Sequence, residues 1–70
     1  MLINGDLVRV PQGTVLLGLN AGTTMPLRVS SDQVMGIVIE NKTTWEDLVK
    51  ILMGDEVVLV DKRMVRLVGN

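Results

Sequence analysis

The sequences MGIVIE at residues 35–40 and VKILMGDEVVLV at residues 49–60 decide the fold. They hold most of the β-branched residues that occur in contiguous runs, and β-branched side chains are enriched in strands. Gly54-Asp55 divides the second stretch, and a glycine-containing pair between apolar runs is typical of a hairpin turn. The pattern therefore predicts three consecutive antiparallel strands, with the segments before and after them closing a small barrel.

The strand expected at residues 33–40 is apolar on both of its sides. Alternation places Val34, Gly36 and Val38 on one side. The other side carries the remaining apolar residues, Met35, Ile37 and Ile39. This arrangement predicts that both sides are covered, as in a tightly curved barrel. For Gly36, a role in packing or in the bend that such a barrel needs fits better than contact with a ligand.

Residues 43–53 fit two different structures. Thr44 followed by Asp47, with Gly54 just past the end, gives the start and stop signals of a three-turn helix. The same residues also alternate as a strand, in which Lys50 points outward. The inward side of that strand would carry Val49, Ile51 and Met53. The pattern alone favours neither structure.

Short apolar runs predict further strands at residues 7–10 and 64–68, a short strand or an extended loop edge at residues 14–19, and a brief edge pairing at residues 27–29. Pro11 ends the first of these because proline cannot donate a ladder hydrogen bond. Asn20 and Gly22 tolerate positive φ, so we expect a loop tip there. The sequence thus predicts one all-β domain over residues 1–70, a small barrel of five or six short antiparallel strands.

The composition narrows the classes of function. There is no Cys and no His, which removes thiolate chemistry and the commonest metal ligands and bases, so we expect no enzyme, metal or cofactor. Seven basic and eight acidic residues give a net charge of −1, which creates no field that attracts nucleic acid or an anionic membrane. Yet 47% of the 70 residues are apolar, more than one small barrel can bury. We therefore expect self-association or a protein partner, and no small-molecule substrate or membrane.

The sequences GDLVRV at residues 5–10, GIVIE at residues 36–40 and VKIL at residues 49–52 together resemble the small SH3-like β-barrels encoded by tailed bacteriophages. The resemblance implies a strand rather than a helix at residues 49–52. It also implies a phage-encoded protein of a virion or of the infected-cell cytoplasm. Eukaryotic SH3 domains bind proline-rich peptides in a groove lined by several aromatic residues. Trp45 is the single aromatic residue here, which argues against that function.

The uncharged segment at residues 10–27 is the expected excess apolar surface. Trp45, in a polar loop, is either a cap over the open end of the barrel, which we favour, or an interface anchor. The residues expected at a protein interface are therefore Val15, Leu17, Leu19, Met25 and Trp45.

Nucleic-acid binding is the alternative function. Its candidate residues are four cations that could contact phosphates, Lys50, Lys62, Arg63 and Arg66. These four residues are better explained as solvated charges that protect a sheet edge, because no aromatic stacking platform accompanies them. A small inhibitor of a host enzyme is a third possibility.

The sequence analysis therefore favours a non-enzymatic structural or adaptor module that packs against protein. No basic segment precedes an apolar run of the kind that directs secretion, so we expect a soluble protein of the cytoplasm.

Overall fold

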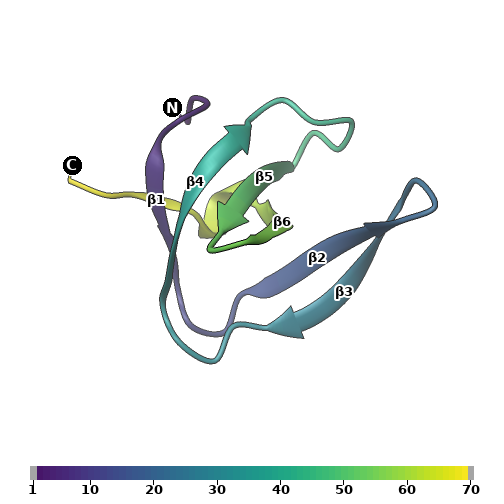
Figure 1. Ribbon diagram of the computed structural model, residues 1–70, viewed down its shortest axis with the longest axis horizontal. Coiled ribbons are helices and arrows are strands. Elements are labelled where there is room, and N and C mark those ends of the chain that lie inside the picture. Colours follow the sequence, from purple (N-terminus) through teal and green to yellow (C-terminus); the bar gives the residue numbers. More distant parts are fainter. Residues whose placement is uncertain (1, 70) are drawn as a thin grey trace.

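Seven antiparallel strands form a single sheet in the computed structural model, which describes residues 2–69 (Figure 1). The strands are β1 (Leu7–Val10), β2 (Val15–Asn20), β3 (Thr23–Val29), β4 (Val34–Glu40), β5 (Leu48–Met53), β6 (Glu56–Asp61) and β7 (Arg66–Leu67). A 3₁₀ turn, η1 (Lys62–Met64), joins the last two strands. The spatial order is β3-β2-β6-β5-β4-β1-β7. The all-β prediction is confirmed, and among the described residues no helix is long and apolar enough to cross a membrane.

The prediction of five or six strands is wrong, because the segment after the β2–β3 turn pairs over its whole length. The two residues of that turn, Ala21 and Gly22, have φ of 54° and 81°. Positive φ at both central residues suits a two-residue hairpin turn, so Asn20 pairs directly with Thr23. The brief strand expected at residues 27–29 consequently begins at Thr23 and continues through Pro26.

The ambiguous segment is a strand, β5, and its inward residues are those that the alternating pattern predicts. Val49 and Ile51 are fully buried and Met53 is 7% exposed. Met53 pairs with Glu56 across the expected turn at Gly54-Asp55. The core gathers the inward residues of β1, β2, β4, β5 and β6 together with Val65. Its members are Val8, Val10, Leu16, Val38, Val49, Ile51, Met53, Val58, Val60 and Val65.

Gly36 lies on the inner side of β4, where β5 comes closest. A Cβ atom at this position would lie 2.5 Å from the Ile51 Cγ2 atom and 2.9 Å from the carbonyl oxygen of Leu52. Both distances are below van der Waals contact, so the two strands reach this separation only because residue 36 has no side chain. The interpretation of Gly36 as a packing glycine is confirmed.

The sheet does not close on itself. The edge strands β3 and β7 are not paired with each other, so the predicted barrel is not shown. The link between β2 and β6 is a single register pair, Leu17 with Leu59. The β2–β3 hairpin therefore extends away from the remaining strands (Figure 1).

The expectation that both sides of β4 are covered is wrong. Met35, Ile37 and Ile39 are 45%, 43% and 39% exposed, whereas Val38 on the other side is fully buried. The reason is that the sheet curls around one core, and within residues 2–69 no second layer lies over the outer side of β4. The strands of this protein are consequently apolar toward the solvent as well as toward the core.

Candidate protein-binding face

A row of apolar side chains crosses four neighbouring strands on the outer side of the sheet. Leu7 of β1 pairs with Ile37 of β4, and Ile37 pairs with Leu52 of β5. Leu52 then pairs with Val57 of β6. Directly paired residues point to the same side of a sheet, so these four side chains form one continuous line. Leu7 is 47% exposed and Val57 is 48% exposed, which shows that nothing in the described chain covers the ends of the row.

The apolar surface continues from this row onto the β2–β3 hairpin. Leu17 pairs with Leu59, which lies on the same outer side of β6 as Val57. Alternation along β2 puts Val15 and Leu19 on this side too, and they are 46% and 50% exposed. We call this surface the outer apolar face and define it by Leu7, Val15, Leu17, Leu19, Met35, Ile37, Ile39, Leu52 and Val57.

As many large apolar residues are exposed as are buried in the part of the chain that the structure describes. The accessible surface is 4561 Å², close to the roughly 4300 Å² expected for a monomer of 7.7 kDa. Among residues 2–69, eleven large apolar residues are exposed and eleven are buried. The distinctive property is therefore the kind of residue at the surface and not the surface area. Large contiguous apolar patches of this kind mark interaction sites.

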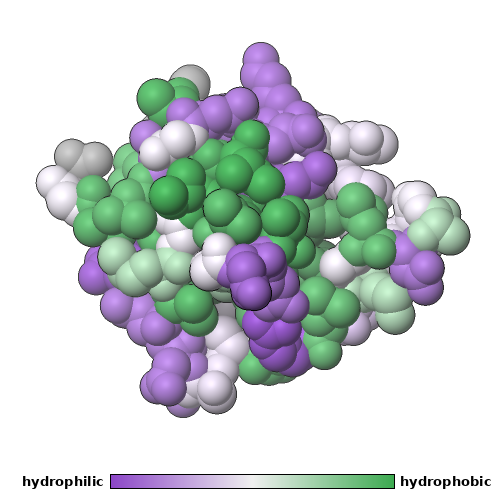
Figure 2. Space-filling view, viewed as in Figure 1, coloured by the Kyte–Doolittle hydropathy of each residue, from purple (hydrophilic) through white to green (hydrophobic). Residues whose placement is uncertain are grey.

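Three shallow hollows divide the outer apolar face. A hollow of about 230 Å³ is lined by Leu7, Met35, Ile37 and Leu52. A second, of about 260 Å³, lies between β2 and β6 beside Leu17 and Leu19, and a third, of about 320 Å³, lies beside Val15 and Leu17. Figure 2 shows apolar side chains gathered over the region of β4 and β5, with hydrophilic side chains around them. A surface with both projecting apolar side chains and hollows between them suits interdigitation with another protein.

The outer side of the sheet also carries charges of both signs. Lys50 of β5 lies beside Leu59, and its Nζ atom is 3.7 Å from the Glu40 Oε1 atom. Arg9 lies opposite Met35, at the margin formed by β1. The Lys50 side chain is 29% exposed, so its methylene groups extend the apolar surface while its charge is paired.

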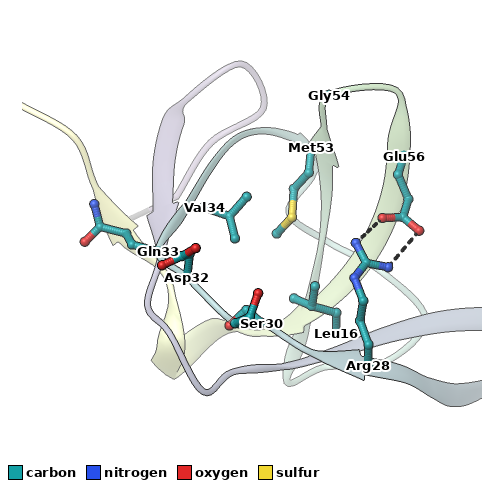
Figure 3. A pocket seen from close by; sticks show the side chains of 10 residues that line it. Leu16, Arg28, Ser30, Asp32, Gln33, Val34, Met53, Gly54 and Glu56 are labelled. Carbon is teal, nitrogen blue, oxygen red and sulfur yellow. Dashed lines mark hydrogen bonds and ion pairs between the residues drawn. The ribbon is translucent and has the colours of Figure 1, made fainter.

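A different hollow, of about 420 Å³, opens between the β2–β3 hairpin and the β5–β6 turn (Figure 3). Leu16, Val34 and Met53 line its apolar part. Arg28 and Glu56 form a two-pronged ion pair beside it. The hydrogen bonds from Arg28 lower the pKa of Glu56 below its ordinary value, so neither group is poised to exchange a proton near neutral pH. This arrangement indicates a clasp between β3 and β6 rather than a catalytic pair.

The structure brings together three of the five residues expected at a protein interface. Val15, Leu17 and Leu19 share the outer apolar face. Met25 pairs with Gly18 and so lies on the opposite side of the hairpin. Trp45 is half-buried in the loop between β4 and β5. The Trp45 backbone N–H donates a hydrogen bond to the Thr43 hydroxyl at 3.1 Å.

Sequence reasoning missed the larger part of the face, which lies on β1, β4, β5 and β6. The missed residues are Leu7, Met35, Ile37, Ile39, Leu52 and Val57. The signal was present as apolar residues on both sides of the central strands. It was interpreted as burial on both sides, whereas one of the sides is open.

Three of the four cations of the alternative function, Lys50, Arg63 and Arg66, contact local partners. Lys50 is paired with Glu40 on the outer side of β5. The Arg63 side chain bonds to Asp61 at 2.7 Å, and together with the Arg63 backbone N–H it lowers the pKa of Asp61 to about 2. Arg66 donates to the carbonyl oxygen of Arg63 at 2.6 Å. Lys62 lines a separate hollow with Lys42. Phosphate binding by Lys50, Arg63 or Arg66 would have to compete with their present contacts.

Within residues 2–69, no three His, Cys, Asp or Glu side chains are grouped closely enough to hold a metal ion. Comparison of the chain with protein-family models, with curated proteins and with solved structures found no match.

Proposed function

We propose that this protein is a non-enzymatic structural or adaptor module that acts by packing its outer apolar face against protein. The observation that carries this proposal is the continuous apolar row from Leu7 to Val57, in which every residue except the half-buried Leu52 is 43–48% exposed. Functions that need a cluster of reactive side chains have less support, because the polar groups described above are engaged with one another.

The energetics require the whole face to take part. Fully burying one Val, Leu, Ile or Met side chain is worth about 1.5–3 kcal/mol. Seven of the nine side chains of the face are 39–50% exposed, and they would then contribute on the order of 5–10 kcal/mol. Association itself costs about 4–15 kcal/mol in lost translational and rotational freedom. A single hollow is therefore too small for lasting binding, and the proposal is an interface that extends from β1 to β2.

We also propose that the curled sheet is an SH3-like architecture that is open between β3 and β7. The inner residues of five strands share one core, which supports this description. The phage setting that the resemblance implies stays a prediction.

The proposal is tested by a matched pair of substitutions and an apolar dye. Leu7 lies on the outer apolar face and is 47% exposed, whereas Leu27 is 46% exposed and packs over Gly18 on the opposite side of the hairpin. At a protein concentration low enough for the chain to be monomeric, we expect anilinonaphthalene sulfonate to fluoresce with the wild type and with Leu27→Lys, and at least severalfold less with Leu7→Lys/Ile37→Lys. Equal fluorescence from all three folded proteins would contradict the proposal.

A further inference from the structure

The size of the molecule restricts how it can form a stable complex. A typical stable interface takes about 800 Å² from each partner. The molecule measures 35 × 26 × 22 Å, so a contact of that area has to use a whole side of it. The outer apolar face extends over five adjacent strands, β2, β6, β5, β4 and β1, and is such a side. A partner must therefore present a broad apolar surface of similar extent.

The charge of the face suits a second copy of the same chain. The net charge is −1, so two copies repel each other little. The outer side of the sheet carries charges of both signs, Glu40 with Lys50 and the exposed Arg9, so a second copy can place unlike charges opposite each other. A strongly charged partner of one sign would find no surface of uniform opposite charge here.

The shape of the face is also self-complementary. Val57 and Leu19 project and are about half exposed. The hollow bordered by Leu7 and Ile37 lies on the same side of the sheet. In a two-fold dimer each copy contributes both projections and hollows, and two sheets pack about 10 Å apart with their side chains interdigitated.

The edges of the sheet are less suited to joining copies. Counting from the two-residue turn, the pair Leu17–Pro26 falls at a non-hydrogen-bonded position, so the missing N–H of Pro26 faces the free edge of β3. The other edge strand, β7, is two residues long. Short edges and edge prolines prevent strand-to-strand pairing, which leaves the face as the surface through which copies associate.

These observations extend the proposed function, on which the inference rests. We infer that the partner of the outer apolar face is a second copy of this chain, packed face to face in a closed two-fold dimer. The apolar strands of the two copies then form a two-layer structure in which both sides of β4 are covered, one by the core and the other by the partner.

The first experiment measures mass by sedimentation equilibrium from about 1 µM to 1 mM protein. We expect the wild type and Leu27→Lys to reach twice the 7.7 kDa of one chain, and Leu7→Lys to need at least tenfold higher concentration for the same association. A dimer that Leu7→Lys leaves unchanged would overturn the inference, as would growth beyond the dimer.

The second experiment uses exposed charges, so that it does not depend on core packing. Glu40→Lys replaces the carboxylate of this ion pair by a second cation, and Lys50→Glu replaces its cation by a second carboxylate. Each variant should dimerise at least tenfold more weakly than the wild type, and an equimolar mixture should recover the dimer. Failure of the mixture to associate better than either variant would contradict face-to-face packing.

The dye experiment separates failure of this inference from failure of the proposed function. A wild type that stays monomeric up to 1 mM overturns the inference. If that monomer binds the dye in a manner that depends on Leu7 and Ile37, the face still awaits another protein and the proposed function stands. If it binds no dye, both fail.

Discussion

Substitution of Gly36 by alanine tests the close approach of β4 and β5 that gives the sheet its curvature. The added Cβ atom would lie 2.5 Å from a methyl group of Ile51 and 2.9 Å from the Leu52 carbonyl oxygen. The side chain can move slightly, but the carbonyl belongs to a paired strand and cannot. Overpacking of this kind costs about 1–3 kcal/mol. The lower entropy of the unfolded alanine chain offsets about 0.4–1 kcal/mol of it.

We therefore expect Gly36→Ala to lower the free energy of unfolding by about 1–2 kcal/mol. With a urea dependence of about 1 kcal/mol per M for so small a domain, the unfolding midpoint falls by on the order of 1–2 M. Trp45 fluorescence and far-ultraviolet circular dichroism should report the same transition.

Gly18→Ala is the matched control, because Gly18 also lies within a strand and has no positive φ. The three atoms nearest to a Cβ atom there all belong to the Leu27 side chain, at 3.0 Å, and this side chain is 46% exposed and free to move. Gly18→Ala should stay within about 0.5 kcal/mol of the wild type. If Gly36→Ala proved as stable as Gly18→Ala, the argument that strand separation at residue 36 depends on a missing side chain would be wrong.

Three further predictions concern the turns and edges. Ser30→Ala should lower the free energy of unfolding in urea by about 1–3 kcal/mol, because the buried Ser30 hydroxyl accepts a hydrogen bond from the Thr14 N–H and donates one to the Pro11 carbonyl oxygen. Ser31 is exposed, so Ser31→Ala should change the stability little. Equal effects of the two substitutions would refute this prediction. The Arg63 contacts lower the pKa of Asp61 from 3.8 to about 2, so Asp61 stabilises the fold fully above about pH 4 and loses this contribution as the pH falls toward 2. Asp61→Asn should therefore make the melting temperature depend less on pH over that range. An unchanged pH profile would contradict the role of the ion pair. Pro26→Val restores an N–H on the free edge of β3 and should accelerate aggregation measured by light scattering; an unchanged rate would show that the edge is protected by something else.

The parts of the fold that could be predicted from the sequence are those that a single local pattern determines. The Gly54-Asp55 turn fixed the register of β5 and β6, and with it the inward side of β5, once the helical alternative for that segment was set aside. Strand number was harder to predict, because the sequence indicated only a brief pairing at residues 27–29. The structure extends this strand back through Pro26, whose missing N–H faces the open edge of the sheet. Closure of the barrel was beyond local patterns, since it depends on pairing between strands far apart in sequence.

The candidate face was missed for a reason that is general to apolar strands. Alternation tells which residues share a side, but it does not tell what covers that side. In β4, Val38 and Ile39 are equally apolar, yet one is fully buried and the other is 39% exposed.

Within residues 2–69, nothing covers the outer side of β4. These residues form one curled sheet whose inner sides enclose the core, and the segments between the strands are turns and short loops. A second layer over β4 would require another sheet or a helix, and the described strands all belong to the first sheet. The apolar residues on the outer sides of β1, β4, β5 and β6 lower the solubility of an isolated monomer without adding to its core. Their arrangement in one register-matched row supports the proposal that another protein chain buries this surface, and the masses of the Glu40 and Lys50 variants, alone and mixed, decide whether that chain is a second copy.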